Sequence, residues 1–209
     1  MAATICPTVT TDNPQTYLEQ MERVEPFAAR IHVDAADGIF THQKLISFDQ
    51  IWWRGNRTID LHVMYKHPWD HLDIILALNP RLVIVHAEAE GNFIAFARQL
   101  RRNGIEAGIA LLPHTKVETI EPALEVADHV LIFSGNLGEF GGEADLSLLD
   151  KVTQVRALRQ SIEIGWDGGV NDKNAKQLAD AGVDVLNVGG YIQHAEDPAH
   201  AYATLKALV

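Results

Sequence analysis

Short apolar segments alternate with longer amphipathic segments along the whole chain. The short segments are four to seven residues long and rich in β-branched residues, a composition typical of buried strands. They predict eight strands, at residues 3–6, 30–34, 58–64, 81–87, 106–112, 129–134, 162–166 and 183–189.

The segments between these strands carry apolar residues at helical spacing, which predicts helices that each bury one face. The last helix is predicted over residues 197–208, with Asp197 as its N-cap and Pro198 in its first turn. Segment 36–57 has the poorest helical spacing. The clearest helical sets are Tyr17, Met21 and Val24; Ile94, Phe96, Ala97 and Leu100; and Leu146, Leu149, Val152, Val155 and Leu158.

Strands that alternate with helices pair in parallel, and eight such units in 209 residues predict an α/β fold, a single (β/α)8 TIM barrel. No break in composition and no linker rich in proline or serine divides the chain, so we expect residues 1–209 to form one domain. An open, doubly wound sheet is the alternative, but the glycine signature of dinucleotide-binding folds does not follow the first strand.

The composition restricts the partners and the location of the protein. Acidic residues outnumber basic ones by 28 to 17, and no basic run is longer than Arg101-Arg102, so we expect neither nucleic acid nor an anionic membrane as a partner. The single cysteine, Cys6, excludes an intramolecular disulfide, and no apolar run reaches transmembrane length, so we expect a cytoplasmic location. An acidic chain can still bind a phosphorylated metabolite through backbone N–H groups.

Four side chains at the ends of predicted strands suit metal and proton chemistry. His32 and Asp34 share one face of their strand because they are two residues apart, and His62 and Asp167 lie at the ends of other strands. Strand ends converge at the mouth of a barrel, so we expect these four to form a divalent-metal site, with either carboxylate a candidate general base. Asp60, two residues before His62, is a candidate to orient that imidazole.

Six ordered motifs extend over nearly the whole chain: CPT at 6–8, HVDAADG at 32–38, DLHVM at 60–64, VHAEA at 85–89, FGG at 140–142 and DGGV at 167–170. This set resembles the ribulose-phosphate 3-epimerase family of sugar-phosphate barrels. The resemblance implies that His32, Asp34, His62 and Asp167 bind one divalent cation (Zn, Fe, Mn or Co) and that Asp34 and Asp167 form the acid/base pair. It also implies an isomerase of the pentose phosphate pathway that interconverts D-ribulose 5-phosphate and D-xylulose 5-phosphate.

Two carboxylates are what a 3-epimerase requires. The enzyme removes a proton from a carbon next to a ketone and returns one to the opposite face, and one base cannot reach both faces. A metal near the C2 and C3 oxygens would stabilise the negative charge of the enediolate as a Lewis acid.

Three glycine pairs follow the last three predicted strands, and phosphate sites in such barrels lie after strands seven and eight. Glycine lets backbone amides approach a phosphate closely, so we expect these pairs to hold the phosphate of a sugar phosphate. Ordinary loop glycine is the alternative reading of each pair. The residues are Gly141 and Gly142, Gly168 and Gly169, and Gly189 and Gly190.

The sugar pocket departs from the family pattern at several positions. Loop 136–142 is one residue longer than the family's and lacks its proline, and Ala35-Ala36 stands where Val-Met is common. Phe133 and Thr8 replace a methionine and a serine, whereas Met64 retains a pocket methionine. The resemblance implies Thr8 and Met64 as substrate contacts, while the altered loop leaves another ketose phosphate, such as allulose 6-phosphate, as an alternative substrate.

Two other functions remain open. The orotidine-phosphate decarboxylase and hexulose-phosphate synthase group is similar in size and phosphate loops, but its Asp-x-Lys-x-x-Asp motif requires a lysine where this chain has Ala36. A non-catalytic sugar-phosphate-binding barrel is the other alternative. A homo-oligomer is compatible with the sequence, which does not determine the oligomeric state.

Some residues whose side chains could take part in catalysis or metal binding are assigned no direct role. His86, in a predicted strand, is assigned a supporting role, and Trp166 either lines the pocket or packs between strands and helices. The other histidines match no ligand pattern, and we expect them at the surface or in loops: His42, His67, His71, His114, His129, His194 and His200.

Overall fold

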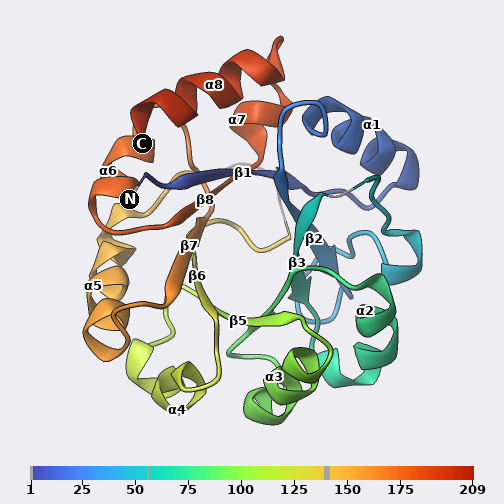
Figure 1. Ribbon diagram of the computed structural model, residues 1–209, viewed down its shortest axis with the longest axis vertical. Helices are drawn as coiled ribbons and strands as arrows, with labels where there is room; N and C mark the ends of the chain where they lie inside the picture. The colour runs from blue at the N-terminus through green and yellow to red at the C-terminus, as the bar shows by residue number, and fades with distance from the viewer. Residues whose placement is uncertain (1, 56, 139–141) are drawn as a thin grey trace.

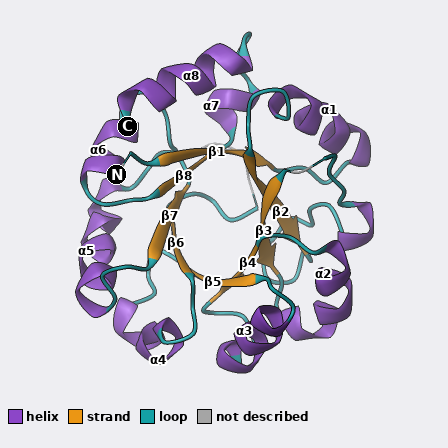
Figure 2. Ribbon diagram, viewed as in Figure 1, coloured by secondary structure: helices purple, strands orange, loops and turns teal. Residues whose placement is uncertain are grey.

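Eight parallel strands close into a barrel in chain order. The computed structural model describes residues 2–55, 57–138 and 142–209. Figure 1 shows the strands following one another around the barrel, and Figure 2 shows the helices on its outside, which confirms the predicted (β/α)8 TIM barrel. The strands are β1 (Thr4–Val9), β2 (Arg30–Ala36), β3 (Thr58–Met64), β4 (Leu82–His86), β5 (Glu106–Leu111), β6 (His129–Phe133), β7 (Glu163–Asp167) and β8 (Val185–Val188).

The helices follow the predicted spacing in most units. The last helix begins at Pro198, and the Asp197 side chain caps it by accepting a hydrogen bond from the backbone N–H of His200, at 3.0 Å. Between β2 and β3 the described residues contain no α-helix, only the 3-10 helix Phe48–Gln50, as the poor spacing there suggests. The helices are α1 (Pro14–Val24), α2 (Leu72–Leu78), α3 (Phe93–Arg102), α4 (Glu121–Leu124), α5 (Leu149–Leu158), α6 (Ala175–Asp180), α7 (Gly190–Gln193) and α8 (Pro198–Leu208).

Three strands are longer at their carboxyl ends than the apolar pattern predicts. β1 continues to Val9, because Thr8 and Val9 pair with β2, and β2 continues to Ala36, which pairs with Met64. β7 includes Asp167, the partner of Asn187 on β8. In each case the extra residues include polar or small side chains, so the strand continues after the apolar run has ended.

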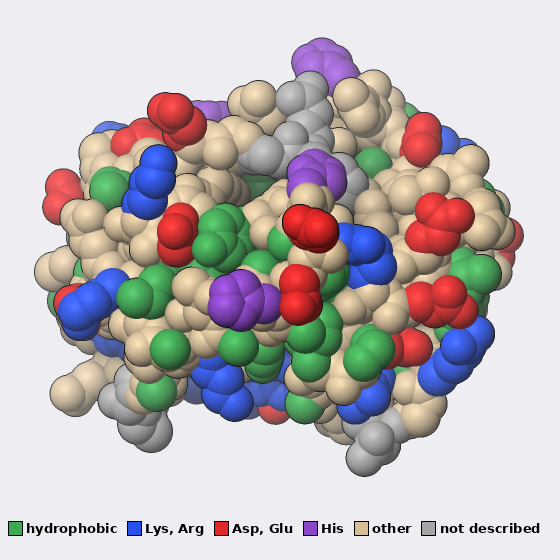
Figure 3. Space-filling model, turned by 90° about the horizontal axis from the view of Figure 1, so that it is seen from above, with side chains coloured by type: hydrophobic (Ala, Val, Ile, Leu, Met, Phe, Trp, Pro, Cys, Tyr) green, Lys and Arg blue, Asp and Glu red, His purple; other side chains and the backbone are tan. Residues whose placement is uncertain are grey.

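The surface carries both signs of charge. On the face shown in Figure 3, acidic and basic side chains are interspersed, although the formal net charge is −11. None of the described residues belongs to a helix that is both long enough and apolar enough to cross a membrane.

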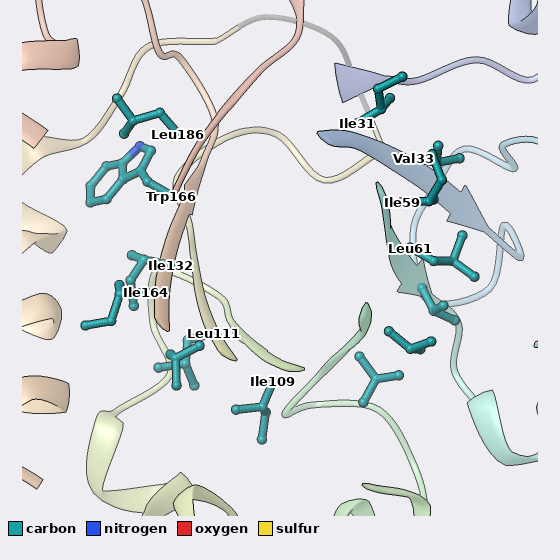
Figure 4. Close-up of a cluster of buried hydrophobic side chains, with 14 of the residues drawn as sticks. Ile31, Val33, Ile59, Leu61, Ile109, Leu111, Ile132, Ile164, Trp166 and Leu186 are labelled. Atoms are coloured by element: carbon teal, nitrogen blue, oxygen red, sulfur yellow. The ribbon is translucent and has the colours of Figure 1, made fainter. Parts of the chain in front are cut away.

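The main core lies between the strands and the surrounding helices. Figure 4 shows outward-facing strand residues that form it, among them Ile31, Leu61, Ile132 and Trp166. Trp166 is fully buried in this layer, so it packs between strands and helices and does not line the pocket. Burying one such side chain stabilises the fold by roughly 1.5–3 kcal/mol.

Because successive strand residues face opposite sides, the neighbours of these core residues point into the barrel. A one-residue shift of β2 would exchange the two sets, placing Ile31 and Val33 inside and His32 and Asp34 among the helices. The apolar outer face therefore fixes the register that directs the polar residues to the interior.

Candidate active site

The four side chains predicted to form a metal site lie together at the mouth of the barrel. One donor atom from each of them lies within 4.8 Å of the others. Nε2 of His32 is 3.3 Å from Oδ1 of Asp34 and 3.8 Å from Oδ2 of Asp167. Nδ1 of His62 is 2.9 Å from Oδ1 of Asp34 and 3.7 Å from Oδ2 of Asp167.

Strand register accounts for this grouping. Asp34 on β2 and His62 on β3 are direct partners across the two strands, and His32 precedes Asp34 by one full period on the same face. Asp167 ends β7, on the far side of β1 and β8, and its side chain reaches the same cluster across the barrel mouth. Two neighbouring strands thus supply three donors and a distant strand supplies the fourth.

The cluster has the chemistry of a metal site. Both ring nitrogens of His32 are buried and have no hydrogen-bond partner of suitable geometry among the described residues, an arrangement that costs free energy in an empty site. Ligands at 2.0–2.2 Å from one ion lie roughly 3–4.4 Å apart, a spacing that matches the contacts within the cluster. Imidazole and carboxylate donors are compatible with several divalent transition metals.

The two carboxyl groups differ in acidity. Burial raises the pKa of Asp167 to about 6, with a further contribution from the negative charge of Asp34. Burial also opposes ionisation of Asp34, but contacts with His32 and His62 outweigh it and hold the pKa of Asp34 below its usual range. The hydroxyl of Thr10 donates a 2.5 Å hydrogen bond to Oδ2 of Asp34 and stabilises the same ionised form.

A cavity of about 350 Å³ adjoins the cluster. Asp34, Asp167, Thr8 and Met64 line it, as expected. Five of the six predicted phosphate-binding glycines also line it, and Gly141 lies outside the described residues. These five are Gly142, Gly168, Gly169, Gly189 and Gly190.

Two of these glycines are required by the backbone itself. Gly168 and Gly169 have φ of +113° and +70°. A Cβ at Gly168 would lie 2.4 Å from the backbone N of Gly135, and one at Gly169 would lie 2.2 Å from that of Ala144. The loop after β7 is therefore in direct contact with the segments that flank the end of β6.

Several polar residues of the cavity were not predicted from the sequence, among them Thr10, Asn171 and Asn187. Thr10 binds Asp34, and Asn171 follows β7. Oδ1 of Asn187 on β8 and Oγ1 of Thr8 are buried and have no hydrogen-bond partner in the part of the chain that the structure describes, so both are available to a bound molecule. The alternation from Cys6 through Thr8 to Thr10 is the sequence signal that would have placed Thr10 on the inner face.

His86 supports His62 directly. The two Nε2 atoms are 2.9 Å apart, and Nδ1 of His86 is 3.4 Å from Oε2 of Glu88. Burial, with a contribution from His62, lowers the pKa of His86 to about 4, so this imidazole is neutral at pH 7. Burial opposes ionisation of Glu88, but contacts with His86 and Thr115 outweigh burial and lower the pKa of Glu88 to about 2.

Two expectations for polar side chains are wrong. Asp60 does not orient His62, because its carboxylate accepts hydrogen bonds from Arg30, at 2.6 Å, and Arg81, at 3.4 Å. His129 is neither in a loop nor at the surface: it begins β6, is 1% exposed, and lies with Nδ1 2.8 Å from Glu163. Both belong to a charge network at the opposite end of the barrel from the cluster.

Comparison with known proteins matches the chain to one family of enzymes. The model of the ribulose-phosphate 3-epimerase family matches residues 4–193. A ribulose-phosphate 3-epimerase of Helicobacter pylori is 34% identical over 175 residues, which cover 80% of each chain. One from Mycobacterium bovis is 32% identical over 186 residues, covering 84% of this chain and 80% of the relative.

The chain belongs to the ribulose-phosphate 3-epimerase family. It is therefore an isomerase, an epimerase that acts on carbohydrates.

Solved structures with similar folds include enzymes outside this epimerase family. A 3-keto-L-gulonate-6-phosphate decarboxylase from Vibrio cholerae has a TM-score of 0.76 at 12% identity, covering 100% of this chain and 97% of that one. A 3-hexulose-6-phosphate synthase from Salmonella typhimurium has a TM-score of 0.72 at 15% identity, covering 100% and 98%. At these identities the likeness concerns the fold alone.

Two departures from the family pattern, Ala36 and the longer loop, lie together. Leu137, from the longer loop, and Phe40 pack against the buried side chains of Ala36 and Met64. Phe133, another departure, lines the cavity, as does Met64. The small side chain of Ala36 leaves space in which Leu137 packs, so the altered loop and the altered strand end form one apolar wall.

Proposed function

We propose that the protein is a metal-dependent 3-epimerase of a ketose phosphate and that its substrates are D-ribulose 5-phosphate and D-xylulose 5-phosphate. The observation that carries the proposal is the buried cluster of two histidines and two carboxylates beside a cavity lined by glycines. The relatives in the family are named for ribulose phosphate, which supports the pentulose pair as the first substrate to test.

In this proposal His32, Asp34, His62 and Asp167 hold one divalent cation, with Zn, Fe, Mn and Co as candidates. The unpaired ring nitrogen of His32 supports it, because a cation would satisfy a buried atom that otherwise lacks a partner. When bound, the cation supplies Lewis-acid stabilisation of the negative charge that develops on the substrate oxygens.

Asp34 and Asp167 divide the proton transfer between them. Each is suited to exchange a proton with C3, one as the base that accepts it and the other as the acid that returns it. For the reverse reaction the two exchange roles. Because the two carboxylates come from opposite sides of the barrel mouth, a ketose between them presents one face of C3 to each.

The phosphate would lie at the glycines after β7 and β8, with the segment that contains Gly142 covering it. Backbone N–H groups are the donors available there, and a hydrogen bond to a charged phosphate is worth about 1.5–3 kcal/mol. Thr8 and Met64 would contact the sugar, between the phosphate and the cation.

Proton exchange at C3 provides the test. Purified protein is incubated in D2O with a panel of pentulose and hexulose 5- and 6-phosphates, and NMR follows deuterium at C3 together with inversion. We expect exchange and inversion of ribulose 5-phosphate, both abolished by a chelator and restored by a divalent metal. Substrate binding without any C3 exchange in the metal-loaded protein would contradict the proposal and favour a non-catalytic binding protein.

A hexulose phosphate such as allulose 6-phosphate is the second candidate substrate. The packing of Leu137 against Ala36 and Met64 favours it, since Ala36 and the longer loop depart from the family pattern and Met64 lines the cavity. A higher kcat/KM for allulose 6-phosphate than for ribulose 5-phosphate in the same panel would select it.

A further inference from the structure

We propose that Glu88 and His86 set the tautomer of His62 and thereby its ability to bind the cation of the proposed epimerase site. Glu88 and His86 are positioning residues in this proposal, because they act on the cation only through His62. The inference rests on the proposed metal site and adds to it a chain of contacts from the loop after β4.

The chain of contacts is continuous and buried. Nε2 of His62 is 2.9 Å from Nε2 of His86, and both rings are 0–2% exposed. Nδ1 of His86 lies 3.4 Å from Oε2 of Glu88, an ion-pair contact, and neither atom has a hydrogen-bond partner of suitable geometry among the described residues. The other oxygen of Glu88, Oε1, accepts from the hydroxyl of Thr115 and from the backbone N–H of Leu112.

Lys151 stabilises the segment that binds Glu88. The ammonium group of Lys151 on α5 donates to the backbone oxygens of Leu112 and Thr115, at 2.6 and 2.7 Å. Leu112 and Thr115 are the residues that bind Glu88, so the carboxylate is anchored to the end of β5 through two donors. Glu88 therefore has a fixed orientation toward His86.

These contacts determine where each proton resides. The two Nε2 atoms are 2.9 Å apart, so one of them donates and the other accepts. An ionised carboxylate can only accept, so we place the proton of His86 on Nδ1, facing Glu88. Nε2 of His86 is then an acceptor, and Nε2 of His62 must donate to it. His62 is left with a free lone pair on Nδ1, directed at Asp34 and Asp167.

That tautomer suits a cation and no other partner in the cluster. Nδ1 of His62 is 2.9 Å from a carboxylate oxygen of Asp34, where a protonated Nδ1 donates a hydrogen bond but a lone pair is repulsive. A cation between the two atoms turns the repulsion into coordination. Metal-binding histidines commonly donate their second N–H to a protein acceptor, here an imidazole held by a carboxylate.

Glu88→Gln tests the proposed positions of the protons on His86 and His62, because a backbone N–H group fixes the orientation of the new amide. The N–H of Leu112 requires the amide oxygen on its side, so the NH2 group faces Nδ1 of His86. The proton of His86 must then move to Nε2, where it opposes the Nε2 proton of His62. We expect Zn2+ affinity, measured by competition with a chromophoric chelator, to fall about 10–100-fold.

Glu90→Gln is the matched control, since Glu90 lies in the same loop and pairs with exposed Lys66, not with His86. Its Zn2+ affinity should equal that of the wild type. Circular dichroism establishes that both variants are folded.

Long-range 1H–15N NMR of the histidine rings in the Zn2+-bound wild type reports the tautomers without any variant. We expect protonation of His86 at Nδ1 and of His62 at Nε2. Protonation of His86 at Nε2, or equal Zn2+ affinity of Glu88→Gln and the wild type, would overturn the inference. A wild-type protein that binds no Zn2+ would overturn the proposed metal site, and the inference with it.

Discussion

Asp34 and Asp167 lie in one buried cluster, yet their carboxyl pKa values are displaced in opposite directions. Asp34 is surrounded by imidazoles and a threonine hydroxyl, which favour its ionised form. Asp167 is buried against the charge of Asp34, which favours its protonated form. The two carboxyl groups of one cluster therefore differ in acidity because their surroundings differ.

Replacing either aspartate by asparagine should lower the rate of epimerisation about 10²–10⁴-fold, because a positioned acid or base contributes this much. The remaining carboxylate still faces one side of C3. Each variant should therefore exchange the C3 hydrogen of only one epimer with D2O, without inversion. NMR of both epimers in D2O measures exchange and inversion together.

Metal content must be determined in the same samples, because Asp34 and Asp167 are also proposed ligands. An Asp167→Asn protein that keeps its metal and inverts C3 at the wild-type rate would show that the two-base mechanism is wrong.

The double substitution His32→Ala and His62→Ala should remove the metal and leave the barrel folded. Both imidazoles are buried at the barrel mouth, whereas the main apolar core lies outside the strands and is unchanged. Elemental analysis and circular dichroism measure metal content and fold. Replacing the exposed His42 and His200 by alanine is the control, and full metal occupancy of the first double variant would contradict the proposed ligands.

The sequence predicts the barrel because the spacing of apolar residues distinguishes its strands from its helices. β3 is predicted to the residue, since all seven of its positions fit the strand pattern. β1 is predicted too short because Pro7, Thr8 and Thr10 mark the end of an apolar run, although the strand continues to Val9. Inner positions at a barrel mouth are polar where they face a ligand, so hydrophobic patterning alone underestimates strand length there.

The grouping of His32, Asp34, His62 and Asp167 is predicted from the sequence because these residues lie toward the ends of apolar strands. The sequence does not predict the partner of His62. Asp60 was the candidate because it is near in sequence, but residues two apart in a strand are about 6.6 Å apart along it. Asp60 instead meets Arg30, and His86 from the next strand meets His62. Such contacts depend on the stagger between strands, which no local pattern reveals.

Glu163→Gln should destabilise the protein by about 1–3 kcal/mol at neutral pH, the range for a hydrogen-bonded charge pair. Glu163 accepts two hydrogen bonds from Arg30, at 2.7 and 2.8 Å, and lies 2.8 Å from His129. Although burial opposes ionisation, these contacts hold the pKa of Glu163 below its ordinary value of 4.5. Urea denaturation at several pH values measures the free energy of unfolding.

The sign of the pH dependence follows from that depressed pKa. An acid whose pKa is lower in the folded state stabilises it above the ordinary value, and this contribution is lost as pH falls through the folded pKa. The difference between wild type and Glu163→Gln should therefore shrink as the pH is lowered below 4.5. A difference that is constant down to pH 2, or equal to that of exposed Glu118→Gln, would contradict the assigned ion pair.

Gly190→Val should raise KM for a ketose phosphate at least tenfold and leave metal content unchanged. Gly190 begins α7 and lines the cavity, and a Cβ there would meet the His194 ring at an ordinary 3.7 Å, so valine fills phosphate space without strain in the backbone. Gly168 and Gly169 do not allow this test, since their positive φ and close backbone contacts would confound binding with folding. Ala199→Val on exposed α8 is the matched control. Equal turnover of phosphorylated and unphosphorylated ketoses by the wild type would contradict a phosphate site and favour a free-sugar epimerase.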